Sequence, residues 1–536
     1  VNGLYAMGNH DLLTKILRQD WGYKGIVMTD WIGIRRDLPT TSEIHAGTDL
    51  LEPGQPEQVK AIIEGVNNGQ LDLKDVDLGV RRMLEYIVKT PSFLKYAASN
   101  KPDLKAHAAI TREAADEGIV LLKNGQLPPN PSNGGGAALR QVLPLQEKGK
   151  LALFGVSSYH LLSGGTGSGC VHTPYVVSMA EGLQKAGFTV SQSLADIYSK
   201  YIDYARLKFQ AERHPGKWFQ QEQFGQQKYP EIGWSLLAIG KEVNGADAAI
   251  VTLGRQAGEG EDRDVKTEFQ LTADEHQLIS DVCEAFHQAG KPVIVVINSG
   301  SVIETASWQS LPDAIVCAWQ PGEEGGNSVA DVLTGNVCPS GRLTMTWPVN
   351  ASDHPSSRNF PGGSPNYDQR RRVTNHEEGI YVGYRYFDTF SRPVAYPFGY
   401  GLSYTTFAYS APKVRVSGDT VTASVTVKNT GRVAGKEVVQ VYVSAPQGQI
   451  EKPVHELKAF AKTRLLQPGE SQTLVMQIAV RDLASFDEQH SQWLTEGGQY
   501  TISFAANSRD VRQQRCIKLQ PYTEQVTPAL GSVHSL

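Results

Sequence analysis

The strongest constraint on the fold is a change of hydrophobic period along the chain. Between about residues 111 and 385, short runs that are apolar at nearly every position alternate with stretches of helical periodicity. Such runs are typical of parallel strands that are buried on both faces. The four runs are "LALFGV" (151–156), "AAIVTL" (248–253), "PVIVVIN" (292–298) and "DAIVCAW" (313–319). The pattern predicts an α/β sandwich domain over residues 111–385.

A helix is predicted between the second and third runs, over "TADEHQLISDVCEAFHQAG" (272–290). Thr272 and Glu275 have the spacing of a capping box, and Gly290 is a typical end signal. A core-facing stripe recurs at helical spacing. It consists of Leu278, Ile279, Val282 and Phe286.

From about residue 406 the period changes to strict alternation. The stretches "TVTASVTVKNTG" (420–431) and "KEVVQVYVSAP" (436–446) place apolar residues at every second position, and turn signals separate them. Several such strands predict an antiparallel β-sandwich of fibronectin type III type. We place it at 406–520, after a linker at 386–405 and before a tail at 521–536.

The first region contains an acid at the end of a short apolar run. In "GIVMTDWIG" (25–33), Ile26–Met28 suit a buried strand, and Asp30 and Trp31 follow at its carboxyl end. In α/β folds this end of a strand is where chemistry usually occurs. Asp30 could instead cap the next turn, and Trp31 could be a core anchor.

A second acid follows a predicted strand in the α/β domain. Glu259 lies between two glycines in "GRQAGEGEDRDVK" (254–266), a setting that can hold a side chain out into a cleft. A solvated acidic turn, or a salt bridge between Glu259 and Arg263, is the simpler alternative. The nearby "SGGTGSGCV" (163–171) matches neither GxGxxG nor GK[ST], which argues against a phosphate-binding loop.

Two carboxylates at strand ends in different domains suggest a cleft between domains. Such a pair suits glycoside hydrolysis, in which one acid is ionised and the other donates a proton to the leaving group. Trp31 beside the first acid fits this interpretation, since an aromatic ring can stack on the apolar face of a sugar.

Charge and composition argue against several other classes of function. The net charge is −5 without a Lys/Arg-rich run, which argues against binding of nucleic acid or a membrane surface. No run of apolar residues is long enough to span a bilayer. The five cysteines are scattered without CxxC spacing, which excludes a dense disulfide framework and a cysteine-based zinc site.

Taken together, these stretches resemble glycoside hydrolase family 3, the multidomain β-glucosidase type. The resemblance runs along nearly the whole chain. The stretches that carry it are "LLTKILRQDWGYKGIVMTDW" (12–31), "AGTDLLEPG" (46–54), "TREAADEGIVLLKN" (111–124), "AWQPGEEGGNSVADVLTGNVCPSGRLTMTWP" (318–348) and "EEGIYVGYRYFDTFSRPVAYPFGYGLSYTTF" (377–407).

The resemblance implies a role for each candidate residue. Asp30 would be the nucleophile, Trp31 a sugar-stacking neighbour and Glu259 the general acid/base. Ser168 resembles a serine that contacts the sugar, and Arg263 would orient the loop of Glu259. The implied reaction is retaining hydrolysis of terminal β-D-glucosyl residues from oligosaccharides or from aryl or alkyl glycosides, without metal or cofactor.

Other functions stay open at this stage. A β-xylosidase or arabinofuranosidase of the same family is the nearest rival. A catalytically inactive carbohydrate-binding fragment is a second alternative. A nucleotide-using α/β enzyme is a third, suggested only by the glycine loop.

The resemblance also implies that the chain is truncated within its N-terminal domain. A (β/α)₈ barrel needs about 250 residues, and residues 1–110 carry only its last two strand units and linker helices. Another chain could supply the rest, and residues 1–536 alone are expected to show no hydrolysis. The start "VNGLYAMGNH" shows no signal sequence, so periplasmic or secreted location rests on the resemblance alone.

Overall fold

The structure is a computed structural model in which the chain forms two compact units. The first comprises residues 1–102, 486–493 and 523–536, and the second 103–485 and 494–522. The described residues are 4–30, 38–127, 140–145, 148–212, 225–257, 259, 263–358 and 376–526. Within these ranges no helix combines the length and the apolar character needed to cross a membrane.

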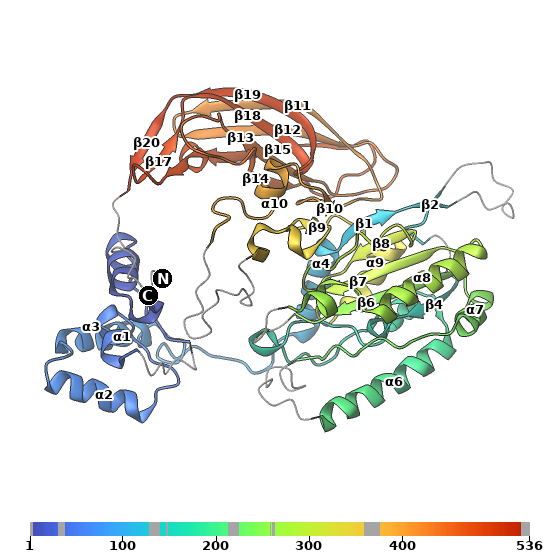
Figure 1. The fold of residues 1–536 in the computed structure, drawn as a ribbon, viewed down its shortest axis with the longest axis horizontal. Coiled ribbons are helices and arrows are strands. Elements are labelled where there is room, and N and C mark those ends of the chain that lie inside the picture. The colour runs from blue at the N-terminus through green and yellow to red at the C-terminus, as the bar shows by residue number, and fades with distance from the viewer. Residues whose placement is uncertain are drawn as a thin grey trace. The chain divides into compact units, whose positions relative to one another are not determined.

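A six-stranded sheet forms the centre of the α/β domain, which is part of the second unit (Figure 1). Its strand order is β1-β8-β7-β6-β4-β5, parallel except for the antiparallel edge strand β1. The strands are β1 (Val120–Asn124), β4 (Lys150–Phe154), β5 (Thr189–Val190), β6 (Ala248–Arg255), β7 (Val293–Ser299) and β8 (Ala314–Cys317). The four predicted apolar runs form β4, β6, β7 and β8, whose residues are almost all buried.

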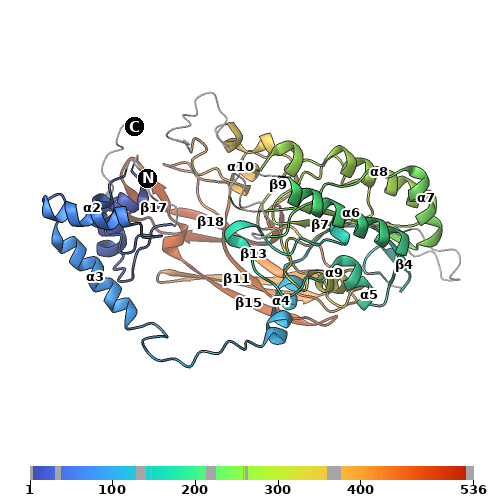
Figure 2. The same ribbon diagram turned by 90° about the horizontal axis from the view of Figure 1, so that it is seen from below.

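Helices cover both faces of this sheet (Figure 2). One core contains residues of α7 (Leu236–Gly245) and α8 (Ala273–Gln288), and the other contains residues of α5 (Met179–Lys185) and α9 (Gly325–Thr334). Two further helices are α4 (Leu104–Gly118) and α6 (Gln192–Ala211). The predicted capping box at the start of α8 and its buried stripe are confirmed. The domain is therefore a three-layer α/β sandwich, as predicted.

The strand order reverses around β4. The chain leaves β4 toward β5 on one side and later returns to β6 on the other side. In open α/β sheets, ligands bind outside the carboxyl ends of two strands where the strand order reverses in this way. The carboxyl ends of β4 and β6 are thus the expected place for a site.

The fibronectin type III-like sandwich consists of two antiparallel sheets over a shared core. One sheet is β11 (Phe407–Ser417), β12 (Thr420–Asn429) and β15 (Ser471–Ala479). The other is β14 (Glu456–Lys462), β13 (Val438–Ser444), β18 (Gly498–Asn507) and β19 (Asp510–Leu519). Glu117 of α4 accepts hydrogen bonds from Lys436 and Lys462, which joins the sandwich to the α/β domain.

Short elements lie between these two domains in the chain. They are the strand pair β9 (Trp347–Pro348) and β10 (Val394–Tyr396), and the helix α10 (Tyr384–Thr389). Asp388 of α10 is paired with His455 and with Arg509 of the sandwich. These contacts fix α10 against the β-sandwich.

The first unit is mainly helical. It contains η2, a π-type helix over Asp11–Asp20, together with α1 (Thr40–Ala46), α2 (Pro56–Asn67) and α3 (Leu73–Ile87). The expectation that Ile26–Met28 form a buried strand is wrong for this structure. Met28 makes one parallel bridge with Leu50 and is 53% exposed. A strand buried on both faces needs paired neighbours on each side. Among the described residues, only the segment around Leu50 pairs with it.

Candidate active site

Asp30 is exposed and directly follows Thr29, whose backbone is hydrogen-bonded within the first unit. The preceding residue, Thr29, is buried, and its backbone N–H donates to the carbonyl of Leu50 at 3.0 Å. The Thr29 hydroxyl accepts a hydrogen bond from the N–H of Glu52 at 2.8 Å. These bonds fix the backbone just before Asp30 and leave its carboxylate open to solvent.

A buried carboxylate that the sequence analysis did not single out supports the same segment. The Asp49 side chain is fully buried and accepts from the N–H of Val27 at 2.8 Å. It also accepts from Arg18 at 2.5 Å and from Arg82 at 3.0 Å. A carboxylate buried between two guanidinium groups is compensated in charge and directional in its bonds. Asp49 therefore positions the segment that ends in Asp30.

Glu259 and Ser168 are in direct contact in the second unit. The hydroxyl of Ser168 donates to Oε2 of Glu259 at 2.5 Å, and the N–H of Ser168 donates to the same oxygen at 2.7 Å. Ser168 lies in a short 3₁₀ turn, Gly167–Gly169, in the connection after β4, whereas Glu259 follows β6. The N–H of Thr166 also donates to the carbonyl of Ala257 at 3.1 Å. The pair thus forms in the connections that follow β4 and β6, where the strand order reverses.

These hydrogen bonds affect the ionisation of Glu259. The Ser168 hydroxyl, followed by its backbone N–H, lowers the pKa of the Glu259 carboxyl below its usual value. The carboxylate is consequently ionised at neutral pH in this arrangement, which suits a proton acceptor. Donating a proton would require a neighbouring negative charge or a weakened Ser168 contact, either of which raises the pKa of a carboxyl group.

Arg263 does not pair with Glu259. Its guanidinium donates to the carbonyl of Val302 at 2.7 Å and to that of Glu268 at 2.7 Å. Trp31 lies outside the described residues, so its stacking role stays a prediction. Asp30 and Glu259 belong to different units, and their convergence on one substrate also stays a prediction.

A cavity of about 400 Å³ lies beside the glycine loop. Its lining combines residues of α4 with the loops after β4 and β8. Polar side chains that line it are His107, Thr111, Ser163, His172, Thr173, Gln226 and Glu323. Several glycines also line it, which exposes backbone groups to a ligand.

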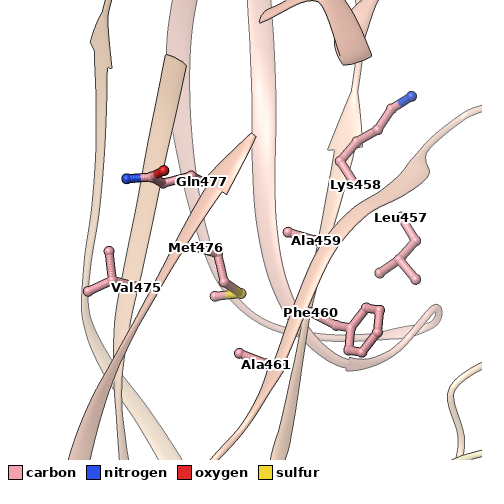
Figure 3. Close-up of a pocket in the computed structure, with 8 residues that line it drawn as sticks. All are labelled: Leu457, Lys458, Ala459, Phe460, Ala461, Val475, Met476 and Gln477. Atoms are coloured by element: carbon pink, nitrogen blue, oxygen red, sulfur yellow. The ribbon is translucent and has the colours of Figure 1, made fainter. Parts of the chain in front are cut away.

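A second hollow of about 500 Å³ runs between β14 and β15 of the sandwich (Figure 3). It is lined by Leu457, Lys458, Ala459, Phe460, Ala461, Val475, Met476 and Gln477. None of the described residues that line it carries a carboxylate, so these residues offer no acid pair for hydrolysis. In the described part of the chain, no three His, Cys, Asp or Glu side chains are grouped so that they could hold a metal ion.

A partly buried acid, Glu231, supports the backbone at the end of β4. Glu231 accepts from the N–H of Val156 at 2.9 Å and from the Tyr198 hydroxyl at 3.0 Å. Tyr198 in turn accepts from the N–H of Gly155 at 2.8 Å. Burial raises the pKa of Glu231 to about 7.

The raised pKa of Glu231 predicts a pH-dependent stability. Below about pH 4.5 the carboxyl is protonated in the folded and unfolded chain alike, and it costs nothing. Between about pH 4.5 and about pH 7 this carboxyl is ionised in the unfolded chain but still protonated in the folded chain, so stability falls. We expect a loss on the order of 3 kcal/mol, complete just above pH 7. Urea unfolding at pH 5 and pH 8 should show that Glu231→Gln removes this part of the loss. The exposed Glu284→Gln on α8 is the control, and an equal pH dependence in Glu231→Gln and wild type would refute the assignment.

Comparison with known proteins assigns the chain to a family. Residues 1–86 match the glycosyl hydrolase family 3 N-terminal domain, and residues 119–404 match the C-terminal domain of the same family. Residues 437–508 match a fibronectin type III-like domain. The chain therefore belongs to glycosyl hydrolase family 3.

Individual relatives agree with this assignment. β-Glucosidase 3B from Thermotoga neapolitana, solved in complex with α-D-glucose, is 41% identical with a TM-score of 0.86. That match covers 97% of this chain and 70% of the other. An exo-α-(1→6)-L-arabinopyranosidase from Bifidobacterium breve is 31% identical over 98% of this chain and 64% of its own length. β-Glucosidase A from Butyrivibrio fibrisolvens is 36% identical over 76% of this chain. The chain spans only 50% of that enzyme, so it covers less than two thirds of both curated relatives.

Proposed function

We propose that residues 1–536 belong to a retaining β-glucosidase that removes terminal β-D-glucosyl residues. The observation that carries the proposal is the similarity to β-glucosidase 3B over 97% of this chain, because that enzyme was solved in complex with α-D-glucose. The contact between Glu259 and Ser168 at the reversal of strand order adds a carboxylate where a family 3 site needs one. Residues 1–110 would contribute the last strands of a (β/α)₈ barrel to this site.

The proposed reaction has two steps. Asp30 attacks the anomeric carbon, and the protonated Glu259 donates its proton to the departing oxygen. The ionised Glu259 then takes a proton from water, which hydrolyses the glycosyl-Asp30 ester. Trp31 would stack on the sugar ring, and Ser168 would contact both the sugar and Glu259.

The pKa of Glu259 would change through this cycle. With Ser168 alone as partner, the carboxyl is held ionised. An ionised Asp30 brought within the 5–5.5 Å of a retaining pair raises the pKa of Glu259 by like-charge repulsion and favours its protonated form. Once Asp30 forms its neutral ester, this repulsion disappears and Glu259 becomes the base that the second step requires.

The second candidate function is hydrolysis of pentosides. One relative favours α-L-arabinopyranosides as the substrates. The Bifidobacterium breve relative is described as acting on α-L-arabinopyranosides, and a β-xylosidase or arabinofuranosidase was open from the sequence. Glucosides and pentopyranosides differ at the C6 hydroxymethyl group. Contacts to that group alone are enough to change specificity by one to two orders of magnitude.

A substrate panel tests the proposal on the full-length protein that contains residues 1–536. We expect kcat/KM for 4-nitrophenyl β-D-glucoside to exceed that for the β-D-xyloside, the α-L-arabinopyranoside and the α-L-arabinofuranoside by about tenfold or more. Proton NMR of the first product should show the β-anomer of glucose. A pentoside as the best substrate would favour the second candidate, and α-glucose as first product would contradict retention.

A further inference from the structure

The segment that carries Glu259 is anchored at both ends by buried polar contacts. It leaves β6 at Arg255 and ends where α8 begins, after Thr272. Arg255 is 1% exposed although it lies at the end of a strand that is apolar along most of its length. A charge so completely buried needs compensation by specific partners.

Arg255 spans the two ends of this segment. Its Nε donates to the carbonyl of Glu268 at 3.0 Å, and one Nη donates to the carbonyl of Gln270 at 3.0 Å. Its two terminal nitrogens also contact the two carboxylate oxygens of Glu275, at 2.5 and 2.7 Å. One guanidinium therefore fixes the last turn of the segment to the strand from which the segment starts.

Glu275 is itself held in place. Its carboxylate accepts from the N–H of Thr272 at 2.9 Å as part of the α8 capping box. Lys228 lies 3.5 Å from the same carboxylate, and the Glu275 side chain is 4% exposed. The start of α8 thus sets the orientation of the Glu275 carboxylate. This carboxylate in turn orients the Arg255 guanidinium.

Further contacts reach closer to Glu259 on each side. On the far side, Arg263 donates to the same Glu268 carbonyl that accepts from Arg255. On the near side, the Gln256 amide contacts the Gln226 carbonyl and accepts from Gln320 at 2.7 Å. Only the few residues between Ala257 and Arg263 separate Glu259 from these anchors.

Stability alone does not explain a buried ion pair at this place. Replacing such a pair by well-packed apolar residues is often neutral or stabilising, whereas its bonds are directional. A planar guanidinium with five donors can define the position of several carbonyl groups at once. This is what a loop needs when one of its side chains must meet a reacting oxygen within a few tenths of an ångström.

We propose that Arg255 and Glu275 are positioning residues for the acid/base Glu259. They act through the backbone at 263–270, which Arg255 holds, and do not touch the substrate. The proposal rests on the proposed function, since it assigns to the pair the task of keeping Glu259 in reach of the departing oxygen.

Two substrates that differ in their need for an acid can show whether Arg255 and Glu275 position Glu259 or only support the fold. A 2,4-dinitrophenolate departs without protonation, whereas the sugar alcohol released from cellobiose needs an acid. The ratio kcat/KM, which reports the steps up to formation of the glycosyl-enzyme, is measured for both substrates with the full-length protein. For Arg255→Lys we expect a loss of about tenfold or more with cellobiose and less than about threefold with 2,4-dinitrophenyl β-glucoside.

Matched variants complete the test. Glu275→Gln keeps the side-chain length and should show the same selective loss with cellobiose. It replaces Arg255→Lys as the test if that variant does not fold. Arg342→Lys is the control, because Arg342 and Glu437 form a similarly buried ion pair in the same unit, joined to the β-sandwich. It should leave the ratio between the two substrates unchanged. Equal losses on both substrates in Arg255→Lys and Glu275→Gln would overturn the proposal, whereas a wild type inactive on both substrates would instead overturn the proposed function.

Discussion

Asp30→Asn in the full-length protein is expected to lower kcat for 4-nitrophenyl β-D-glucoside by about 10⁴-fold or more, the scale of losing a covalent nucleophile. The amide has nearly the shape of the carboxylate, so folding and binding should persist. It lacks the negative charge that attacks the anomeric carbon and stabilises the oxocarbenium-like transition state. Steady-state kinetics and a thermal melt of the same preparation measure both quantities.

The control for this variant is Asp77→Asn, which changes an exposed acid on α3 of the same unit. It should retain wild-type kcat. Asp30 would not be the nucleophile if Asp30→Asn kept more than a few per cent of wild-type turnover. A loss of turnover that came with a large drop in melting temperature would instead identify Asp30 as a structural cap.

Glu259→Ala is expected to separate the two steps of the reaction. For cellobiose, kcat/KM should fall by about 10²–10⁴-fold, the usual contribution of a general acid. For 2,4-dinitrophenyl β-glucoside the first step should be nearly unaffected, and the glycosyl-enzyme should accumulate because no base activates water. Added azide needs no base, so it should restore kcat and yield β-glucosyl azide.

Ser168→Ala provides a graded counterpart to Glu259→Ala. Removing the hydroxyl eliminates one of the two hydrogen bonds that lower the pKa of Glu259, so that pKa should rise. The alkaline limb of the pH profile of kcat/KM, which reports loss of the protonated acid, should move to higher pH.

The azide experiment tests the assignment of Glu259 itself. If azide restored turnover in a variant of a different acid and not in Glu259→Ala, the acid/base role would belong to that other acid.

Much of the α/β domain could be predicted because its signals are local. A strand buried on both faces must be apolar at nearly every position, and the four runs that became β4, β6, β7 and β8 show this directly. The capping box of α8 is equally local, since Thr272 and Glu275 are three residues apart. Strict alternation likewise identified β12, whose buried positions alternate along the strand.

The contacts that build the site could not be predicted in this way. Ser168 and Glu259 are far apart in the sequence and meet only because β4 and β6 are neighbours. Arg255 lies at the end of an apolar strand, and its partners Glu268, Gln270 and Glu275 follow only from the path of the chain. Asp49 stands in a stretch already singled out, "AGTDLLEPG", but its pairing with Arg18 and Arg82 requires the fold. The prediction for Ile26–Met28 was wrong because an apolar run does not specify how many strands flank it.

Mechanism-based labelling tests the central claim most directly. A 2-deoxy-2-fluoro-β-glucosyl fluoride slows both steps but loses its leaving group readily, so the covalent intermediate accumulates. After proteolysis of the labelled full-length protein, mass spectrometry should find the sugar on Asp30, and Glu259→Ala should carry the same label. A sugar attached to any other acid, or stoichiometric turnover without a covalent adduct, would contradict the account.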